Sequence, residues 1–276
     1  MAGEPRIGCQ TYTWEMRGEA WTGSPDDILD VVSEAGYEGV EFSNAMIGRY
    51  LDAPGRFAEA LEQHGLACAA YAYATTGFTE VDRLEQDLAG AMQGLAFCAA
   101  LDVPLCLGGA ASPSREGYEA KLAQAIRFYT TVAERGAKMG VMVCVHPHSH
   151  HGSLLESAAE YDMLLSRTKA SGLMFNPDAG HVVRGGQDLL DCFRRHRDRI
   201  AHVHIKDVDA DGSWQPLGRG RIDWQALFGF LQDTGYDGWI VAEEESREAW
   251  QDAGGAVAGN RRFLRSMGLS GERDGK

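Results

Sequence analysis

One complete unit of the fold can be read in residues 25–42, which have the sequence PDDILDVVSEAGYEGVEF. The first part, Pro25–Ala35, has a helical pattern of apolar residues. Gly36 follows it and supplies the left-handed residue that commonly ends a helix. The apolar run Gly39–Phe42 is then typical of a short β-strand. The segment therefore predicts a helix, a glycine stop and a strand, in that order.

The same order recurs along the chain, with Gly65 and Gly235 also placed between a helical stretch and a strand. Strands that alternate with helices indicate parallel strands joined by right-handed crossovers. We expect strands at Ile7–Thr11, Gly39–Phe42, Ala67–Tyr73, Pro104–Leu107, Met142–His146, Leu173–Asp178, Ile200–Lys206 and Trp239–Glu243. We expect helices at Pro25–Ala35, Ala58–His64, Val81–Leu101, Lys121–Met139, Ser157–Arg167, Asp188–Arg195, Trp224–Thr234 and Gly255–Met267.

Eight strand-and-helix units predict a closed (β/α)₈ TIM barrel of class α/β. An open, doubly wound sheet is the alternative, but no G-x-G-x-x-G motif follows the first strand. No low-complexity tract or Pro/Ser-rich linker divides the chain. The sequence therefore predicts one domain, residues 1–276, with a polar C-terminal tail from about Gly268.

Composition and charge exclude several classes of protein. Hydrophobic residues at 44% and charged residues at 24% are ordinary for a globular enzyme. The formal net charge of -14 argues against nucleic-acid binding, which depends on clustered Lys and Arg. The six cysteines form no C-x-x-C pair and suit a reducing compartment. No signal-like or membrane-spanning apolar run is present, so we expect a cytoplasmic protein without a membrane partner.

Polar residues that bear chemistry follow the predicted strands. In a TIM barrel, functional residues lie where strands end and the following loops begin. The strand ends supply Glu41, then His146 with His148, His150 and His151, then Asp178 with His181, then His202, His204 and Lys206, and finally Glu243 and Glu245. Such a mixture of imidazoles and carboxylates suits a divalent metal ion, with Mn²⁺, Mg²⁺, Co²⁺, Fe²⁺ and Zn²⁺ all compatible.

Four of these residues are candidate metal ligands, namely His146, Asp178, His204 and Glu243. Each has an alternative role. His146 is a core histidine or an uncoordinated base in the other interpretations, and Glu243 is an alternative base or part of a solvated run. Asp178 would otherwise cap a helix, and His204 would be a hydrogen-bonded histidine inside the barrel. We name His146 and Glu243 as the candidate catalytic residues.

Four residues are candidates for substrate contact, namely Glu41, His148, His181 and Lys206. Their alternatives are structural. Glu41 would make internal hydrogen bonds, His181 would cap a helix, and Lys206 would pair with its neighbour Asp207. His148, together with His150 and His151, would otherwise form a solvated loop or an adventitious metal-binding cluster.

The sequence resembles the sugar isomerase/epimerase superfamily with its xylose-isomerase-like barrel. The resemblance is carried by motifs along nearly the whole chain, namely Gly36–Glu41 (GYEGVE), Asn176–His181 (NPDAGH), His202–Asp207 (HVHIKD), Pro216–Gly220 (PLGRG) with Ile222–Trp224 (IDW), and Gly235–Trp239 (GYDGW) before Glu243. It implies a divalent ion, often Mn²⁺, with Asp178, His204 and Glu243 at three ligand positions. It also implies that His181 touches substrate.

Position 146 departs from the pattern of the superfamily. Many members have a glutamate where this chain has His146, and that glutamate often serves as an acid/base group. The His-Pro-His form of residues 146–148 is closer to the dehydratase-like and deglycosidase-like branches. The departure leaves both the first ligand and the exact reaction open.

The expected function is a metal-dependent sugar or polyol isomerase or epimerase that removes a proton beside a carbonyl and forms an enediolate. The alternative on the same scaffold is a lyase, either an inosose-type dehydratase or a deglycosidase of 3-keto-glycosides or C-glycosides that acts by β-elimination. An apurinic-type endonuclease and a non-catalytic subunit are further alternatives. The expected partner is a small sugar or polyol, and a homo-oligomer or a partner subunit is compatible with the sequence.

Overall fold

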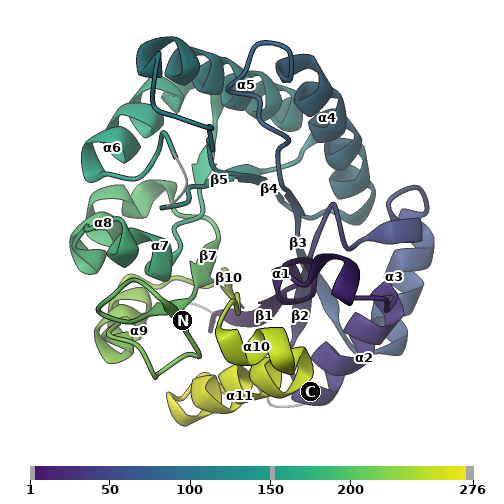
Figure 1. Ribbon diagram of the computed structural model, residues 1–276. Coiled ribbons are helices and arrows are strands. Elements are labelled where there is room, and N and C mark those ends of the chain that lie inside the picture. Colours follow the sequence, from purple (N-terminus) through teal and green to yellow (C-terminus); the bar gives the residue numbers. More distant parts are fainter. Residues whose placement is uncertain (1–3, 150–152, 272–276) are drawn as a thin grey trace.

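The computed structural model describes residues 4–149 and 153–271, and it places a ring of strands inside a ring of helices (Figure 1). The ring contains eight parallel strands in the order β6-β5-β4-β3-β2-β1-β10-β7. Their bounds are β1 Arg6–Gln10, β2 Gly39–Ser43, β3 Ala67–Tyr73, β4 Leu105–Gly108, β5 Val143–His146, β6 Met174–Phe175, β7 Val203–Ile205 and β10 Trp239–Ala242. The predicted (β/α)₈ TIM barrel is confirmed.

The barrel closes between β6 and β7 by two isolated parallel bridges and not by a continuous ladder. The bridges pair Phe175 with Ile200 and Asp178 with His204. Two backbone hydrogen bonds support them, from Ala201 N to the Phe175 carbonyl at 3.1 Å and from the His204 N to the carbonyl of Pro177 at 3.0 Å. We call this junction the β6–β7 seam.

The longer helices cover the outside of the strands, at the positions that the sequence predicts to within a few residues. They are α2 Pro25–Ala35, α3 Pro54–Gln63, α4 Leu84–Leu101, α5 Tyr118–Met139, α6 Ala158–Arg167, α8 Leu189–His196, α9 Trp224–Asp233 and α11 Ala253–Ser266. Shorter α-helices are α1 Tyr12–Glu15, α7 Ala179–Arg184 and α10 Arg247–Gln251, and 3₁₀ helices lie at Gly18–Ala20, Gly48–Tyr50, Lys169–Ser171 and Arg197–Arg199. In the described ranges, no helix is both long enough and apolar enough to span a membrane.

Local sequence explains the bounds of these helices, and α2 is a clear example. Ser24 and Asp27 form a reciprocal capping box, and Pro25 occupies the first turn, where a missing N–H costs nothing. Gly36 ends the helix with φ of 81°, a conformation in which a side chain would be strained. Gly65 and Gly235 also have positive φ, at 65° and 69°. The three predicted glycine stops are therefore confirmed.

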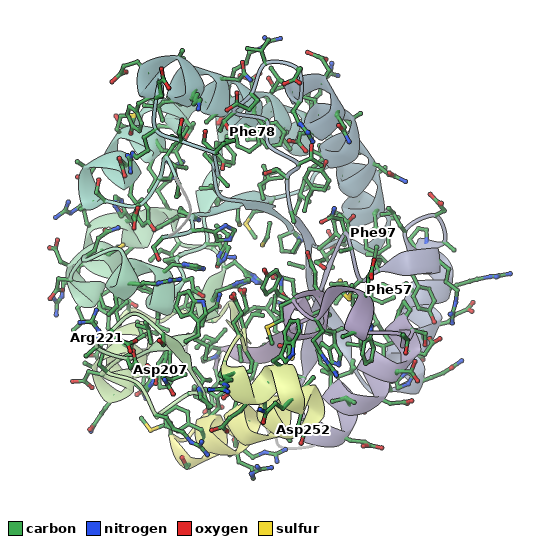
Figure 2. The ribbon with its side chains drawn as sticks, in the orientation of Figure 1. Phe57, Phe78, Phe97, Asp207, Arg221 and Asp252 are labelled. Atoms are coloured by element: carbon green, nitrogen blue, oxygen red, sulfur yellow. The ribbon has the colours of Figure 1, made fainter. Side chains whose placement is uncertain are left out.

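The main hydrophobic core lies between the strands and the helices. Phe57 on α3 and Phe97 on α4 point into this layer (Figure 2), with ring centroids 5.8 Å apart, and Phe57 also contacts Phe42 of β2 edge to face. A second, small cluster of Ala70, Cys106 and Cys144 comes from three consecutive strands. Because these side chains are small, they leave space inside the barrel for larger polar groups near the strand ends.

The predicted strand Leu173–Asp178 is wrong in its second half, because only Met174–Phe175 forms β6. Pro177 has no N–H to donate to a ladder. Asp178 instead caps the start of α7, and its side chain accepts a hydrogen bond from the His181 N at 2.7 Å. The chain thus turns from strand into helix directly at a candidate metal ligand.

A loop between β7 and α9 is organised by Asp207 (labelled in Figure 2), whose side chain is buried. The carboxylate accepts hydrogen bonds from the backbone N–H groups of Val208, Gly218, Gly220 and Ile222 and from the indole of Trp224. The alternative that Lys206 pairs with Asp207 is therefore wrong. The HVHIKD, PLGRG and IDW motifs meet at this carboxylate, which explains why they occur together. The loop contains the antiparallel hairpin of β8 Asp207–Val208 and β9 Trp214–Gln215.

Candidate functional site

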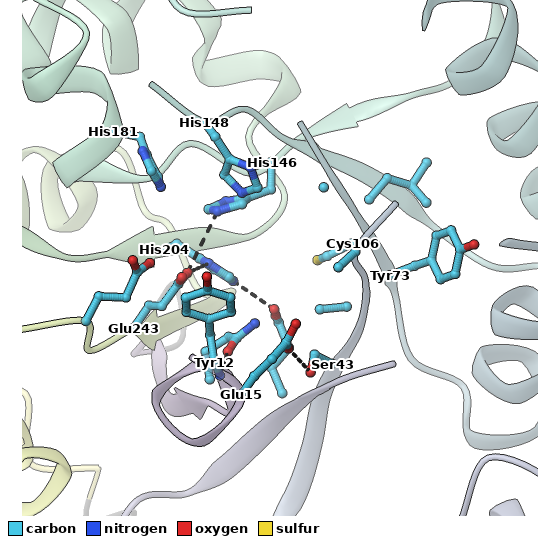
Figure 3. Close-up of a pocket in the computed structure, with 17 residues that line it drawn as sticks. Tyr12, Glu15, Ser43, Tyr73, Cys106, His146, His148, His181, His204 and Glu243 are labelled. Atoms are coloured by element: carbon cyan, nitrogen blue, oxygen red, sulfur yellow. Dashed lines mark hydrogen bonds and ion pairs between the residues drawn. The ribbon is translucent and has the colours of Figure 1, made fainter. Parts of the chain in front are cut away.

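Most of the polar residues at the strand ends line one cavity of about 220 Å³ at the carboxyl end of the barrel (Figure 3), whereas Asp178, His202 and Lys206 are buried outside its lining. Residues from β5, β7 and β10 and the loops that follow them form a polar wall, and residues of β3 and β4 form a wall of smaller and more apolar groups. The lining residues are Gln10, Tyr12, Glu15, Glu41, Ser43, Ala72, Tyr73, Ala74, Cys106, Leu107, Gly108, His146, His148, His181, His204, Glu243 and Glu245. The cavity therefore presents chemically different surfaces to a small molecule.

The four predicted metal ligands lie together. His146 ends β5, Asp178 caps the start of α7, His204 lies in β7, and Glu243 follows β10. One ligand atom of each lies within 4.8 Å of the others, and all four side chains are buried. The Nδ1 of His204 is 3.0 Å from Oε2 of Glu243, and the Nε2 of His146 is 3.8 Å from the same oxygen. We refer to these four residues as the four-residue group.

Several buried atoms of the four-residue group have no hydrogen-bond partner among the described residues. They include both ring nitrogens of His146 and the Oδ2 of Asp178. Burial raises the pKa of Asp178 to about 6; the charge of Lys206 opposes this rise and that of Glu243 adds to it. Burying polar atoms without partners is costly. A bound cation would offset that cost, and two imidazoles with two carboxylates fit the preferences of divalent first-row metals. The residues present therefore fit such an ion.

His146 is available either as a ligand or as a base. Burial holds the pKa of its ring well below the usual value, and the neighbouring His204 and His148 lower it further. The ring is therefore neutral near neutral pH and keeps one lone pair. The geometry brings His146 to the four-residue group without deciding between the two predicted roles.

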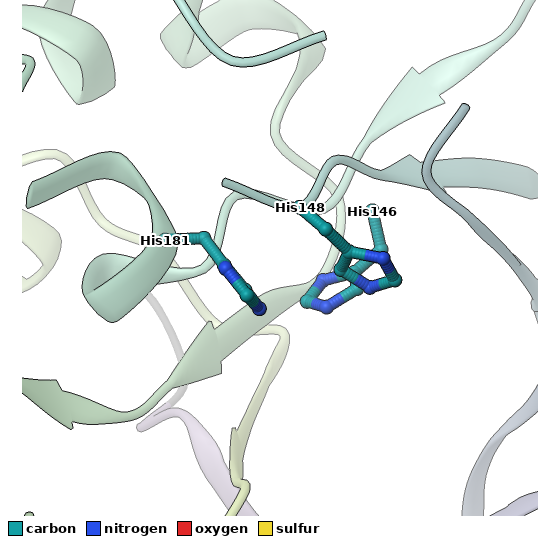
Figure 4. Close-up of side chains that lie close together, drawn as sticks. All are labelled: His146, His148 and His181. Carbon is teal, nitrogen blue, oxygen red and sulfur yellow. The ribbon is translucent and has the colours of Figure 1, made fainter. Parts of the chain in front are cut away.

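A second cluster of imidazoles consists of His146, His148 and His181 (Figure 4), whose ligand atoms also lie within 4.8 Å of one another. Ring centroids are 4.7 Å apart for His146 and His148 and 5.0 Å apart for His148 and His181. This cluster contains no carboxylate, and the Nζ of Lys206 lies 3.3 Å from the Nε2 of His181. Because two carboxylates balance the charge of a divalent cation and three neutral imidazoles do not, the four-residue group is the better cation site. His150 and His151 lie outside the described residues.

Lys206 directly follows β7, is buried, and pairs with two carboxylates that follow the neighbouring strand β10. Its Nζ donates to Oε1 of Glu243 at 2.9 Å and to Glu245, and it lies 4.6 Å from the centre of the Trp214 ring. The two glutamates raise the pKa of Lys206 despite its burial, which alone would lower it. Lys206 therefore stays an ammonium ion. Burial and the charge of Glu243 raise the pKa of Glu245 to about 7.

The orientation of His181 is fixed by Ser149, a residue to which the sequence assigned no role. The Nδ1 of His181 accepts a hydrogen bond from the backbone N–H of Ser149 at 3.1 Å, and the Ser149 hydroxyl lies at the same distance. Burial lowers the pKa of His181, so the ring is neutral. Because a backbone N–H can only donate, Nδ1 is the acceptor and Nε2 carries the proton.

Glu41 reaches the interior of the barrel from β2 and is fully buried. Its Oε2 accepts a hydrogen bond from the Nε2 of His202 at 2.8 Å, and its Oε1 lies 3.0 Å from the Nε2 of His204. The two histidines lower the pKa of Glu41 to about 2, against the effect of burial. Glu41 also lines the cavity, as expected for a substrate contact, but its described polar contacts are internal.

Comparison with known proteins gives the same fold. The model of the xylose isomerase-like TIM barrel family matches residues 29–267. The 3-keto-D-glucoside 4-epimerase YcjR from E. coli superposes with a TM-score of 0.77 and 17% identity, covering 95% of this chain and all of that one. The IOLI protein, whose crystal structure contains a zinc atom, superposes with a TM-score of 0.81 and 14% identity, covering 98% of this chain and 100% of that one.

A relative with higher sequence identity is an inosose dehydratase from Lacticaseibacillus casei. It is 32% identical over 136 residues, which cover 43% of this chain and 45% of the relative. The match thus spans less than half the length of the curated relative.

Proposed function

Because the chain belongs to the xylose isomerase-like TIM barrel family, we propose that it is a divalent-metal-dependent enzyme that removes a proton from a carbon beside the carbonyl group of a sugar or polyol. The observation that carries the proposal is the four-residue group, of which His146, His204 and Glu243 line the cavity at the carboxyl end of the barrel and Asp178 is buried beside them. Both ring nitrogens of His146 and the Oδ2 of Asp178 have no hydrogen-bond partner among the described residues. Functional residues of TIM barrels lie at this end.

The ion would be held by His146, Asp178, His204 and Glu243, with Mn²⁺ as the first candidate and Mg²⁺, Co²⁺, Fe²⁺ or Zn²⁺ as alternatives. When bound, a divalent ion supplies Lewis-acid polarisation of a carbonyl oxygen and its neighbouring hydroxyl. The structurally similar IOLI protein binds a zinc atom, which supports the proposal that this chain also binds a metal ion. Asp178 also holds the start of α7, so a ligand and the neighbouring His181 are positioned by one side chain.

His146 is the first candidate for the base that takes the proton. Its ring lines the cavity, is buried, and has nitrogens without hydrogen-bond partners in the described part of the chain. Glu243 is the alternative base, although its two oxygens already contact His204 and Lys206. A positioned base typically contributes about 10²–10⁴-fold to the rate.

His181 and Lys206 are proposed to stabilise the oxygen on which negative charge develops. The Nε2–H of His181 and the ammonium group of Lys206 lie 3.3 Å apart. Two donors cannot hydrogen-bond to each other, but both can donate to one oxygen that lies to one side of the pair, within hydrogen-bond distance of each nitrogen. Donors that are fixed in place before charge develops are the usual means by which enzymes stabilise an enolate oxygen. His148, at the edge of the same cavity, and Glu41 are the remaining candidates for substrate contact.

Two outcomes can follow the proton transfer. Return of the proton to another face or to the adjacent carbon gives an epimerase or an isomerase, which is the expectation from the superfamily. In the alternative, the electron pair of the broken C–H bond forms a C=C bond, a β-substituent leaves with its own electron pair, and that group takes up a proton. The inosose dehydratase relative and the histidine at position 146 both favour this second, lyase outcome.

The test is a solvent-deuterium exchange screen of the purified protein loaded with Mn²⁺. A panel of ketoses, inosose and 3-keto-glycosides would be incubated in D₂O, and products would be read by NMR and mass spectrometry. Deuterium at the carbon beside the carbonyl supports the proposal, and loss of water or of an aglycone identifies the lyase. Absence of exchange with every substrate by metal-loaded protein contradicts the proposal and favours a non-catalytic subunit. Cleavage of abasic DNA would instead identify the nuclease.

A further inference from the structure

We propose that Glu41 is a positioning residue for metal binding, which keeps a proton on the Nε2 of His204 and so leaves the Nδ1 of His204 free to bind the cation. The inference rests on the proposed function, because it concerns the same metal site. It differs from the expected substrate contact, because Glu41 would act through His204.

Glu41 crosses the barrel to reach its partners. It lies on β2, whereas His204 lies on β7, and β1 and β10 stand between these two strands in the sheet. The exposed fraction of Glu41 is 0%, although burying a carboxylate is expensive unless charged or hydrogen-bonding groups compensate it. A carboxylate kept in this position must therefore be balanced by the two histidines.

The two nitrogens of His204 face different carboxylates. Nδ1 lies 3.0 Å from Oε2 of Glu243, inside the four-residue group, and Nε2 lies 3.0 Å from Oε1 of Glu41, outside that group. The second pair is close but not aligned as a hydrogen bond, and neither atom has another partner among the described residues. Metal-binding histidines commonly donate their other N–H to a carboxylate, which fixes the ring and its tautomer.

His202 holds the other oxygen of Glu41. Its Nε2 lies 2.8 Å from Oε2, and because a carboxylate can only accept, His202 donates its Nε2–H to Glu41. This hydrogen bond fixes the rotation of the carboxylate and directs Oε1 toward His204. Glu41, His202 and His204 are also close enough to hold a cation themselves. The proton between His202 and Glu41 argues against that arrangement, and the experiment below separates the two.

The experiment measures the affinity of the full chain for Mn²⁺ by titration calorimetry. We expect Glu41→Ala to weaken Mn²⁺ binding by about 100-fold and Glu41→Gln by about 10-fold, the range seen when such supporting carboxylates are lost. The amide of the second variant would keep an acceptor for the Nε2–H without the charge. The control is Glu15→Gln, which changes another carboxylate of the cavity that contacts Ser43 and not His204. The control should bind Mn²⁺ as the wild type does.

A double-variant comparison tests whether Glu41 acts through His204. In a His204→Ala background, Glu41→Gln should cause no further loss of the remaining Mn²⁺ affinity. An additional tenfold loss in that background would overturn the inference, and so would unchanged affinity in both Glu41 variants. Thermal unfolding of Glu41→Gln without metal shows whether the fold is retained, so that misfolding is not mistaken for lost positioning.

The tautomer of His204 gives a readout independent of affinity. In the Zn²⁺-loaded protein labelled with ¹⁵N-histidine, NMR should show a protonated Nε2 and a metal-bound Nδ1 for His204. Zinc bound to Nε2 would overturn the inference and indicate the site of Glu41, His202 and His204. If the wild type binds neither Mn²⁺ nor Zn²⁺, the proposed function fails first. Metal binding by the wild type with no response to Glu41 rejects only the positioning role.

Discussion

Asp178 and His204 are paired across the β6–β7 seam, where a parallel bridge joins two members of the four-residue group. The His204 N–H donates to the carbonyl of Pro177, next to Asp178. The backbone contact that closes the barrel therefore also sets the spacing of two candidate ligands. This relationship gives the sharpest test of the proposed site.

Two variants of Asp178 separate its charge from its role as helix cap. Asp178→Asn keeps an oxygen for the His181 N–H and should lose Mn²⁺ binding and exchange activity while unfolding nearly as the wild type does. Asp178→Ala should also lose Mn²⁺ binding and exchange activity. In addition, its free energy of unfolding should fall by about 1 kcal/mol, because the cap of α7 is removed. Calorimetry and urea unfolding check the two effects. Full turnover in Asp178→Asn would contradict the assignment.

Binding of Mn²⁺ should stabilise the folded protein against unfolding, and this effect should require His204 as a ligand. A ligand present at about 100 times its Kd adds about 2.7 kcal/mol to the free energy of unfolding, because it binds only the folded state. We expect a rise in Tm of several degrees on adding Mn²⁺ and its reversal by a chelator, with no rise in His204→Ala. An equal rise in that variant would place the ion elsewhere.

Replacement of His146 distinguishes a ligand from a base. We expect His146→Ala to reduce deuterium exchange by about 10²–10⁴-fold. Mn²⁺ affinity measured on the same sample then assigns the role, because a base leaves affinity nearly unchanged and a ligand does not. Exchange at the wild-type rate would remove His146 from the proposed reaction.

Lys206→Met should be strongly destabilising, because it leaves Glu243 and Glu245 buried beside each other without their cation. Breaking such a buried pair costs about 3–5 kcal/mol. The double variant Lys206→Met/Glu245→Gln should recover part of the stability and none of the activity. Recovery of turnover along with stability would show that Lys206 serves only as a counter-ion.

The Asp207 loop offers a matched pair of glycine substitutions. A Cβ at Gly220 would collide with the Asp207 carboxylate and the Val208 carbonyl, whereas a Cβ at Gly229 on α9 meets no atom within 4 Å. Gly220→Ala should lower the free energy of unfolding by more than about 1 kcal/mol. Gly229→Ala should raise it by about 0.5–1 kcal/mol, because alanine is the better helix former. Chemical denaturation of both variants gives the comparison.

Much of the fold and the members of the site could be predicted from local sequence. Helix stops such as Gly36 and strand ends such as Glu243 depend on neighbouring residues, and a barrel brings all strand ends to one rim. Contacts between elements distant in the sequence could not be predicted. Two examples are the contact of Glu41 with His204 and the hydrogen bond from Ser149 to His181, which depend on the order and twist of the strands. The apolar run that begins at Leu173 predicts a strand as far as Asp178, but β6 ends at Phe175 because Asp178 caps the next helix.

The wall of the cavity formed by β3 and β4, where Ala72, Cys106 and Gly108 lie, takes no part in the proposed chemistry. Its contribution is one of shape. A molecule held by its reacting end at the polar wall extends toward these small groups, so their size limits how long or how branched that molecule can be. Adding or removing a single methyl group in a side chain of this wall would therefore change which substrates fit, while the reacting residues stay the same. One catalytic arrangement could in this way serve different substrates.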